Sequence, residues 1–273
     1  MIGQINIFEN DMVQQSIKRL KMFEPSEGYY LAFSGGKDSC VIKALADMAG
    51  VKYDAHYRLT SVDPPELVHF IQKEHPDVSI DKPRYDSGEL KGKQITMWNL
   101  MPLKRMPPTR LVRYCCESLK EDGGEGRFKV TGVRRAESAK RSKRSGLEIG
   151  KGKSHKREMF DPDNPDQEMF HACQQKAERI MNPIIDWSDE DVWEFIKGND
   201  IPYCGLYDEG FKRLGCVGCP IAGDKRWKEF ERWPKYKRNY ISAMERTLQV
   251  RLDKGLKTEW TSGQEMFEWW MKQ

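Results

Sequence analysis

The sequence lacks any long hydrophobic run. None of its 273 residues belong to an apolar stretch long enough to span a bilayer, which takes about 20 residues. The first fifteen residues, MIGQINIFENDMVQQ, also lack the basic and apolar segments of a secretory signal peptide. We therefore expect a cytoplasmic protein that has no membrane partner.

A disulfide framework is also missing. The seven cysteines are an odd number in a chain without an export signal, whereas disulfide frameworks belong to small secreted domains. The spacing of the close pairs points instead to metal or redox chemistry. The cysteines form one adjacent pair, one CxxC pair and three single residues: Cys115 and Cys116, Cys216 and Cys219, and Cys40, Cys173 and Cys204.

The glycine loop in YYLAFSGGKDSCVIKALADMAG, residues 29–50, matches neither the Walker A pattern nor GxGxxG. It does follow a predicted buried strand and precede a predicted helix that begins near Asp38. The glycines allow the backbone N–H groups to approach an anion, the helix N-terminus adds partial positive charge, and Lys37 adds a full one. This arrangement predicts a phosphate site formed by Ser34, Gly35, Gly36, Lys37, Asp38 and Ser39.

Elsewhere the chain alternates between strand and helix patterns. Such alternation predicts an α/β fold with an open, mostly parallel twisted sheet and helices on both faces. Strands are expected at 29–33, 51–59 and 128–133, and helices at 11–23, 38–49, 63–75 and 188–200, with Ser188 as the N-cap of the last. A terminal helix is expected to follow Ser262.

The motif SGGKDS resembles the pyrophosphate loop of the adenine nucleotide alpha hydrolases, the PP-loop ATP pyrophosphatase superfamily. LTSVDPPELVHFI, VTGVRRAESAKR and the long stretch NPIIDWSDEDVWEFIKGNDIPYCGLYDEGFKRLGCVGCP are similar to motifs of its phosphoadenylyl-sulfate (PAPS) reductase branch, in the same order. The resemblance covers most of residues 11–223. It implies that the loop binds ATP or adenylyl sulfate, with Mg²⁺ accompanying ATP, and that Asp63 and Gly132 contribute to the nucleotide site.

Two arginines follow the predicted strand at 128–133. Ligands of open α/β sheets bind beyond the carboxyl ends of the strands, and the planar guanidinium groups of Arg134 and Arg135 suit phosphate or sulfate. We expect both, with Lys37, to be catalytic residues that stabilise charge in the transition state. The alternative is that the two arginines are only the solvated start of a basic loop.

The two cysteine pairs can supply four thiolates, enough for zinc or for a [4Fe–4S] cluster. The adjacent pair resembles the pattern of cluster-bearing adenylyl-sulfate reductases and DNA phosphorothioation enzymes. We therefore predict a [4Fe–4S] cluster, with a zinc ion and the absence of any metal as alternatives. The predicted ligands are Cys115, Cys116, Cys216 and Cys219.

The sequence also departs from the assimilatory reductases of this branch. Those enzymes carry a nucleophilic cysteine in a Glu-Cys-Gly-Leu-His tail, whereas no cysteine follows Cys219 here. The first hypothesis is therefore an enzyme of sulfur transfer or ATP-dependent substrate adenylation. The second is a thiol-dependent PAPS or adenylyl-sulfate reductase whose thiol comes from Cys204 or from a thiol or sulfur-donor protein.

A third hypothesis rests on charge. Residues 134–157 hold ten Lys or Arg and two Glu, a local charge of +8 in a chain whose net charge is +4. The segment suits an accessory protein that binds nucleic acid and has a regulatory nucleotide site, or else it is a solvated loop. We expect a nucleotide-binding domain over 1–223 with a flexible basic insertion at 138–170, a cysteine-rich subregion, and a helical extension over 224–273.

The start of that extension, residues 224–248, interleaves aromatic and basic side chains. Such a stretch can stack on bases. Its apolar residues also recur at helical spacing, which favours a helix face buried in the core. The predicted core residues are Phe230, Tyr240, Met244 and Leu248.

Overall fold

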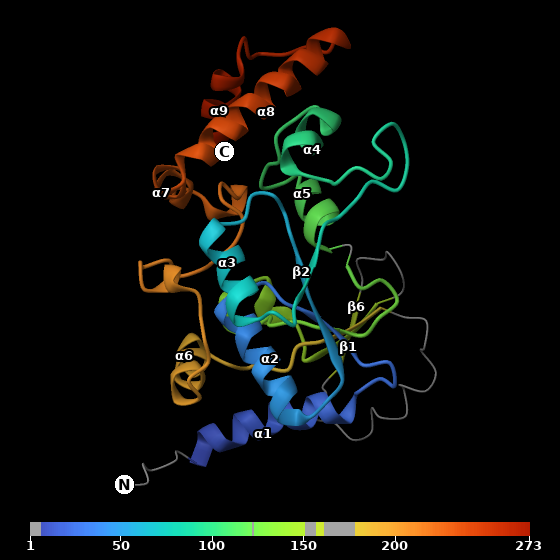
Figure 1. Cartoon of the computed structure of the whole chain (residues 1–273), viewed down its shortest axis with the longest axis vertical. Coiled ribbons are helices and arrows are strands. Elements are labelled where there is room, and N and C mark those ends of the chain that lie inside the picture. Colours follow the sequence, from blue (N-terminus) through green and yellow to red (C-terminus); the bar gives the residue numbers. More distant parts are fainter. Residues whose placement is uncertain (1–6, 122, 151–156, 161–177) are drawn as a thin grey trace. The chain divides into compact units, whose positions relative to one another are not determined.

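The structure is a computed structural model that describes residues 7–121, 123–150, 157–160 and 178–273 (Figure 1). Cys173, one of the three single cysteines, lies outside the described residues. Among the helices of the described ranges, none has the length and apolar character needed to cross a membrane.

The strands form one seven-stranded sheet in the order β3-β2-β1-β4-β7-β5-β6. The neighbours β1 and β2, β1 and β4, and β4 and β7 run parallel, and β5 runs antiparallel to both β7 and β6. The predicted fold class, an open and mostly parallel α/β sheet, is confirmed. The strands are β1 Tyr29–Ala32, β2 Tyr53–Arg58, β3 Ser79–Asp81, β4 Lys129–Val130, β5 Leu147–Gly150, β6 Arg157–Phe160 and β7 Glu178–Met181.

The helices begin and end close to the predicted positions. Ser188 caps α6 as expected, because its hydroxyl accepts a hydrogen bond from the backbone N–H of Asp191 at 3.1 Å. The α-helices are α1 Ile7–Met22, α2 Lys37–Ala49, α3 Pro65–Glu74, α4 Met97–Lys104, α5 Tyr114–Cys116, α6 Asp189–Gly198, α7 Lys225–Arg232, α8 Pro234–Asp253 and α9 Gly263–Met271 (Figure 1).

The chain divides into two compact units. The first comprises residues 1–57, 69–79 and 124–213, and the second comprises 58–68, 80–123 and 214–273. This division differs from the predicted boundary at residue 223, because the C-terminal helices share a core with segments from early in the chain.

Helix α8 shows why the second unit has this composition. Its buried side chains include Tyr240, Met244 and Leu248, and it packs against α9 and against α4, whose Leu100 and Met101 are also buried. The prediction of a core face in residues 224–248 is therefore confirmed. The apolar face of α8 is buried partly against this earlier segment of the chain.

In the first unit, the core lies along β1 and α2. Tyr29 and Leu31 of β1 are fully buried, as are Val41, Ile42 and Leu45 of α2. Helix α2 packs against both α1 and α6. This packing fixes the N-terminus of α2, where the predicted phosphate loop lies.

Two strands, β5 and β6, lie within residues 138–170, the segment predicted to be a flexible basic insertion. Glu148 of β5 is buried, and it binds the guanidinium of Arg144 and the side-chain amide of Asn182. These partners allow a charged residue to enter the sheet. Residues 151–156 and 161–170 lie outside the described residues.

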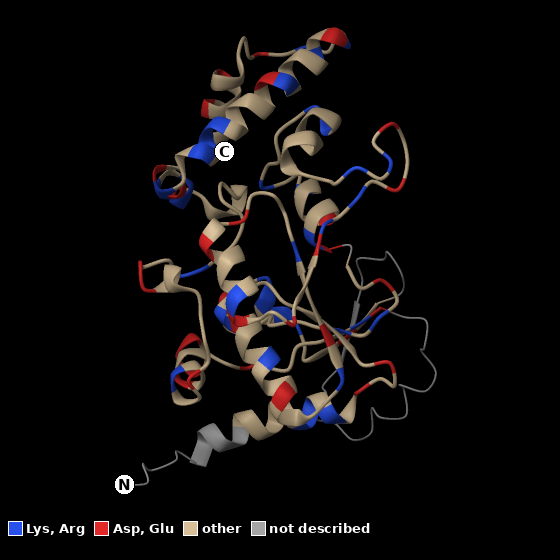
Figure 2. Ribbon diagram, in the orientation of Figure 1, with Lys and Arg blue, Asp and Glu red and all other residues tan. Residues whose placement is uncertain are grey.

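The arginines of the basic segment are largely neutralised. Arg135 pairs with Asp186, Arg141 with Glu137, and Arg144 with Glu148. Lys and Arg are also frequent on α7 and at the start of α8 (Figure 2).

Candidate functional site

The loop between β1 and α2 has the geometry of an anion site. Gly35 has a φ of +72°, a left-handed conformation that favours glycine. The backbone N–H of Gly36 donates to the Ser34 hydroxyl at 3.3 Å, and Ser39 Oγ donates to the Gly36 carbonyl at 2.7 Å. The backbone N–H of Lys37 donates to the Tyr207 hydroxyl at 2.9 Å. The loop is thereby held in a turn at the N-terminus of a 13-residue helix.

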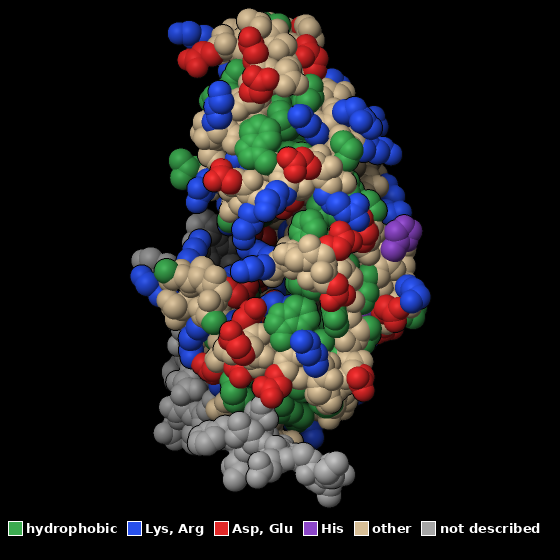
Figure 3. Space-filling model, turned by 90° about the vertical axis from the view of Figure 1, so that its left-hand side faces the viewer, with side chains coloured by type: hydrophobic (Ala, Val, Ile, Leu, Met, Phe, Trp, Pro, Cys, Tyr) green, Lys and Arg blue, Asp and Glu red, His purple; other side chains and the backbone are tan. Residues whose placement is uncertain are grey.

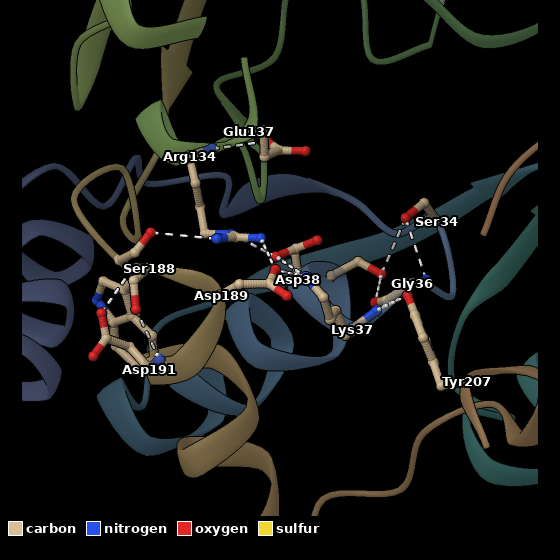
Figure 4. Close-up of polar contacts among 12 residues, drawn as sticks. Ser34, Gly36, Lys37, Asp38, Arg134, Glu137, Ser188, Asp189, Asp191 and Tyr207 are labelled. Carbon is tan, nitrogen blue, oxygen red and sulfur yellow. Dashed lines mark hydrogen bonds and ion pairs between the residues drawn. The ribbon is translucent and has the colours of Figure 1, made fainter. Parts of the chain in front are cut away.

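Two buried cations meet at this helix terminus. Lys37 Nζ lies 2.6 Å from Asp189 Oδ1, and Arg134 Nη2 lies 2.9 Å from the same oxygen. Arg134 Nε also donates to Asp38 Oδ1 at 2.7 Å. Figure 4 shows Arg134 reaching from the segment after β4 toward Asp38 and Asp189. The structure thus brings together Lys37 and Arg134, two of the three predicted catalytic residues.

The electrostatics of this cluster favour the charged forms of Asp189 and Arg134. Burial alone would raise the pKa of Asp189, but hydrogen bonds from Lys37 and Arg134, and their charges, hold it below its usual value. Burial would likewise lower the pKa of Arg134, whereas Asp38 and Asp189 raise it. The cluster is therefore an ionic network with two cations and two carboxylates.

Gly132 contributes by allowing close packing. A Cβ placed on it would lie 3.0 Å from the carbonyl carbon and oxygen of Asp38. The chain after β4 therefore approaches the first turn of α2 more closely than a larger residue permits. This approach places Arg134 beside the loop.

Arg135, the third predicted catalytic residue, is directed elsewhere. Its guanidinium pairs with Asp186, and its Nε donates to the carbonyl of Arg144 at 3.1 Å. The side chain is 45% exposed, whereas that of Arg134 is 2% exposed. Only one of the two adjacent arginines therefore lies at the phosphate loop.

Asp63 belongs to the second unit. Its carboxylate accepts a hydrogen bond from the backbone N–H of Thr60 at 2.6 Å, and its carbonyl accepts one from the Tyr236 hydroxyl at 2.6 Å. It is buried and stabilises the turn that follows β2. Its predicted part in nucleotide binding stays a prediction.

The four predicted metal ligands all belong to the second unit. A hydrogen bond with Cys116, burial, and the charges of Cys116, Cys216 and Cys219 raise the pKa of Cys115. Cys216 also donates to Thr60 Oγ1 at 3.5 Å. Within the described ranges, no three His, Cys, Asp or Glu side chains are placed to hold a metal ion.

Two cations accompany these cysteines. Arg113 Nη2 lies 3.1 Å from Cys116 Sγ. A hydrogen bond from Cys115, together with Arg113, lowers the pKa of Cys116 to about 6, although burial opposes the shift. The charge of Cys216 raises the pKa of Lys120. The positive charges of Arg113 and Lys120 offset the negative charge of thiolates. This arrangement suits a metal group that is bound by several thiolates.

A hollow of the second unit is lined by three cations and by no acidic residue. Arg232, which pairs with Glu66, lies there with Lys235 and Arg238. Among the described residues, Lys235 and Arg238 have no ion-pair partner. Lys and Arg also gather between hydrophobic side chains on the face of the molecule in Figure 3. The structure thus shows a second basic surface, besides the basic segment of residues 134–157 that the sequence predicts.

Two of the single cysteines, both in the first unit, are buried. Cys40 and Cys204 are each 1% exposed. Burial raises the pKa of Cys40 to about 12, so its thiol is protonated near neutral pH. Its Sγ lies 3.9 Å from Nε2 of His75.

A comparison with known families agrees with this geometry. The Phosphoadenosine phosphosulfate reductase domain matches residues 28–222, which include the loop, the arginines and all four paired cysteines. The chain belongs to this family. The resemblance predicted from the motifs is therefore confirmed.

Curated relatives of this PAPS reductase family chain include an uncharacterised protein of Methanocaldococcus jannaschii, 28% identical over 227 residues, which are 79% of this chain and 47% of that protein. The adenosine 5′-phosphosulfate reductase of Oceanobacillus iheyensis is 28% identical over 186 residues, 64% of this chain and 60% of that enzyme. The chain therefore spans less than two thirds of either relative.

Solved structures similar to this family member include the PAPS reductase of Candida auris in a phosphate complex, with a TM-score of 0.48 and 15% identity over 79% of this chain and 97% of that one. The FMN adenylyltransferase of Candida glabrata has a TM-score of 0.47 and 15% identity over 77% of this chain and 62% of that one. At these values neither likeness bears on the activity of this chain.

Sequence reasoning missed two residues of the loop site, Asp189 and Tyr207. Asp189 lies in the acidic first turn of α6, a common position for a carboxylate that stabilises a helix N-terminus. Tyr207 follows Cys204 in a segment without clear periodicity. The only signal for either was membership of the long family motif, which assigns no contact to them.

Proposed function

We propose that this protein is an enzyme that binds ATP or an adenylyl-sulfate nucleotide in the loop of residues 34–39. The observation that carries the proposal is the convergence of Lys37 and Arg134 at the N-terminus of α2. Both side chains are buried and positively charged, and both reach a single oxygen atom, as they would reach a phosphate oxygen. Mg²⁺ is the expected companion of ATP.

The loop residues suit a reaction that develops charge on phosphate. Lys37 and Arg134 are buried beside the loop before a ligand arrives, so the two cations themselves need little reorganisation when charge builds up in the transition state. The backbone N–H groups at the start of α2 add further donors. The proposed reaction is sulfur transfer or ATP-dependent adenylation of a substrate.

We further propose that Cys115, Cys116, Cys216 and Cys219 hold a [4Fe–4S] cluster. Two observations support this proposal: the other three thiols act on Cys115, and Arg113 and Lys120 offset the charge of the thiolates. A cluster takes one cysteine per iron, whereas zinc draws its four ligands around a single ion. A bound cluster would supply redox or sulfur chemistry.

The first experiment is purification without oxygen, followed by an absorbance spectrum and iron and zinc analysis. A broad shoulder near about 400 nm with about four irons per chain, both lost in Cys115→Ala, supports the cluster. A colourless protein with one zinc contradicts it. Release of pyrophosphate from ATP, measured on the same sample and lost in Lys37→Ala, tests the nucleotide reaction.

A second candidate is thiol-dependent reduction of an adenylyl-sulfate nucleotide. The observation in its favour is the similarity to an adenosine 5′-phosphosulfate reductase over 64% of this chain. Cys204 is buried, so the thiol would come from a partner protein or from added thiol. Release of labelled sulfite in the presence of thioredoxin would support this reaction. Its absence at all thiol concentrations would eliminate it.

The third candidate, a nucleic-acid-binding accessory protein, is favoured by the basic hollow. Arg135, Arg141 and Arg144 of the basic segment are paired, whereas Lys235 and Arg238 have no ion-pair partner within the described part of the chain. Their exchange for Gln should weaken binding of a single-stranded oligonucleotide and reduce its salt dependence. Lys228→Gln, an exposed change on α7, is the matched control.

A further inference from the structure

One carboxylate oxygen holds both cations of the phosphate loop. Asp189 Oδ1 lies 2.6 Å from Lys37 Nζ and 2.9 Å from Arg134 Nη2. Asp38 contributes a separate oxygen, 2.7 Å from Arg134 Nε and 3.4 Å from Lys37 Nζ. Asp189 thus accepts hydrogen bonds in the manner of a phosphate oxygen placed between a lysine and an arginine (Figure 4).

The exposure of these side chains shows which partner is free to leave. Lys37 and Arg134 are 5% and 2% exposed, whereas Asp189 is 57% exposed. The cations are therefore fixed within the unit, and the carboxylate approaches them from its solvent side. An anion that arrives from solvent meets Asp189 before it reaches Lys37 or Arg134.

We propose that Asp189 is a built-in competitor of the nucleotide phosphate. In the ligand-free protein its carboxylate neutralises Lys37 and Arg134, and a phosphate group displaces it on binding. The inference rests on the proposed function, because it assumes that the loop binds a phosphate. It adds a residue outside the loop of residues 34–39 that tunes the affinity of the site.

Electrostatics explain why displacement is required. The cluster of two cations and two carboxylates is formally neutral, so a phosphate that entered beside Asp189 would meet a like charge at close range. Once displaced, the Asp189 carboxylate remains in the first turn of α6, where the helix N-terminus stabilises it. The protein thereby retains buried cations without leaving them unpaired in the absence of ligand.

The test is binding of inorganic pyrophosphate to the full chain by isothermal titration calorimetry. Since the competing contact lowers the fraction of binding-competent protein, Asp189→Asn should tighten pyrophosphate binding by roughly tenfold. Glu190→Gln is the matched control. It removes the same charge from the next residue of the helix, which is exposed and has no ion-pair partner among the described side chains, and should change the Kd by less than about twofold.

The outcomes separate the two proposals. Unchanged or weaker pyrophosphate binding by the Asp189→Asn variant overturns the competitor role. A residue that only positions Lys37 and Arg134 is needed in the bound state as well, so its loss does not tighten binding. If the wild type does not bind pyrophosphate and Lys37→Ala has no further effect, the proposal that residues 34–39 bind a nucleotide is overturned. If Asp189→Asn does not fold, Asp189→Ser is measured instead, since Ser is well tolerated at the start of a helix. Pyrophosphate should then raise its Tm more than that of the wild type.

Discussion

At the scale of single residues, the loop site depends on a close approach that only glycine permits. Gly132 lies against the backbone of Asp38, whereas Gly198, at the end of α6, has nothing within 4 Å of a Cβ placed on it. The same change from Gly to Ala therefore has opposite consequences at the two positions.

We predict that Gly132→Ala lowers the free energy of unfolding by about 1–3 kcal/mol, because the added methyl group forces β4 away from α2. It should also weaken pyrophosphate binding, since Arg134 is two residues away. Gly198→Ala should raise stability by about 0.5–1 kcal/mol. Urea unfolding of both variants checks the signs, and equal destabilisation by both would contradict the close-approach argument.

His75 provides a pH-dependent contribution to stability. Its ring packs against Phe33 and Phe70, with centroids 4.7 and 5.2 Å away, and it is 7% exposed. Burial and, to a lesser extent, the charge of Lys43 lower its pKa below 6.5, and this shift is opposed by the carboxylates of Asp77, Glu74 and Asp47. The folded protein therefore holds His75 in its neutral form.

Because the folded pKa lies below the unfolded one, the unfolded chain takes up a proton first as the pH falls. The contribution of His75 is fully present above pH 6.5 and declines below it, by at most about 1.4 kcal/mol per pH unit, until the folded pKa is reached. We expect the stability difference between wild type and His75→Gln to shrink between about pH 7 and 5 in urea titrations. His69→Gln, at an exposed position, serves as the control, and a pH-independent difference would refute the assignment.

At the scale of elements, the sequence predicted the helices and strands that are marked by a local pattern of residues. The β1 strand and the helix that follows it are marked by an apolar run, two glycines and a 3.6-residue period. The α6 helix is marked by its Ser188 cap. The N-terminus of α2 and the position of Arg134 after β4 followed from the same patterns, so three of the four residues of the cluster, Lys37, Asp38 and Arg134, could be predicted.

The sequence did not predict features that depend on contacts between residues far apart in the chain. Strand β5 enters the sheet with a charged residue, Glu148, whose partners Arg144 and Asn182 satisfy it only in the folded chain. Asp189 has the sequence signature of a helix start, and its pairing with Lys37 joins positions 152 residues apart. No local pattern encodes such a contact.

One prediction concerns how α7 anchors α9. Arg226 is 1% exposed, and its guanidinium donates to the carbonyls of Trp270 and Met271 at 3.0 and 3.1 Å. These are carbonyl groups at a helix C-terminus that lack partners within the helix. We expect Arg226→Met to lower the free energy of unfolding by about 3 kcal/mol.

Arg226→Lys should recover only part of this loss, because an ammonium group does not reproduce the planar fork. Lys228→Met, on the exposed side of α7, should stay within about 0.5 kcal/mol of the wild type. Guanidinium titrations followed by tryptophan fluorescence measure all three. Equal stability of Arg226→Met and Lys228→Met would show that the buried guanidinium does not anchor α9.

At the scale of the whole molecule, the two candidate centres are built from different units. The residues of the phosphate loop cluster, Lys37, Asp38, Arg134 and Asp189, belong to the first unit, and the four paired cysteines belong to the second. Each centre therefore has its own set of structural supports. If each folds on those supports alone, ligand binding at one should not depend on the integrity of the other.

A double-mutant cycle tests this independence. We expect Cys219→Ser to remove iron while it leaves pyrophosphate affinity within about twofold of the wild type, and Lys37→Ala to weaken pyrophosphate binding by roughly tenfold or more while iron content is retained. The double variant should show the sum of the two free-energy changes in pyrophosphate binding, because sites without shared partners are additive. A coupling energy above about 0.5 kcal/mol would instead mean that the cysteines and the loop act on one bound nucleotide, as expected if the sulfur chemistry takes place on the nucleotide itself.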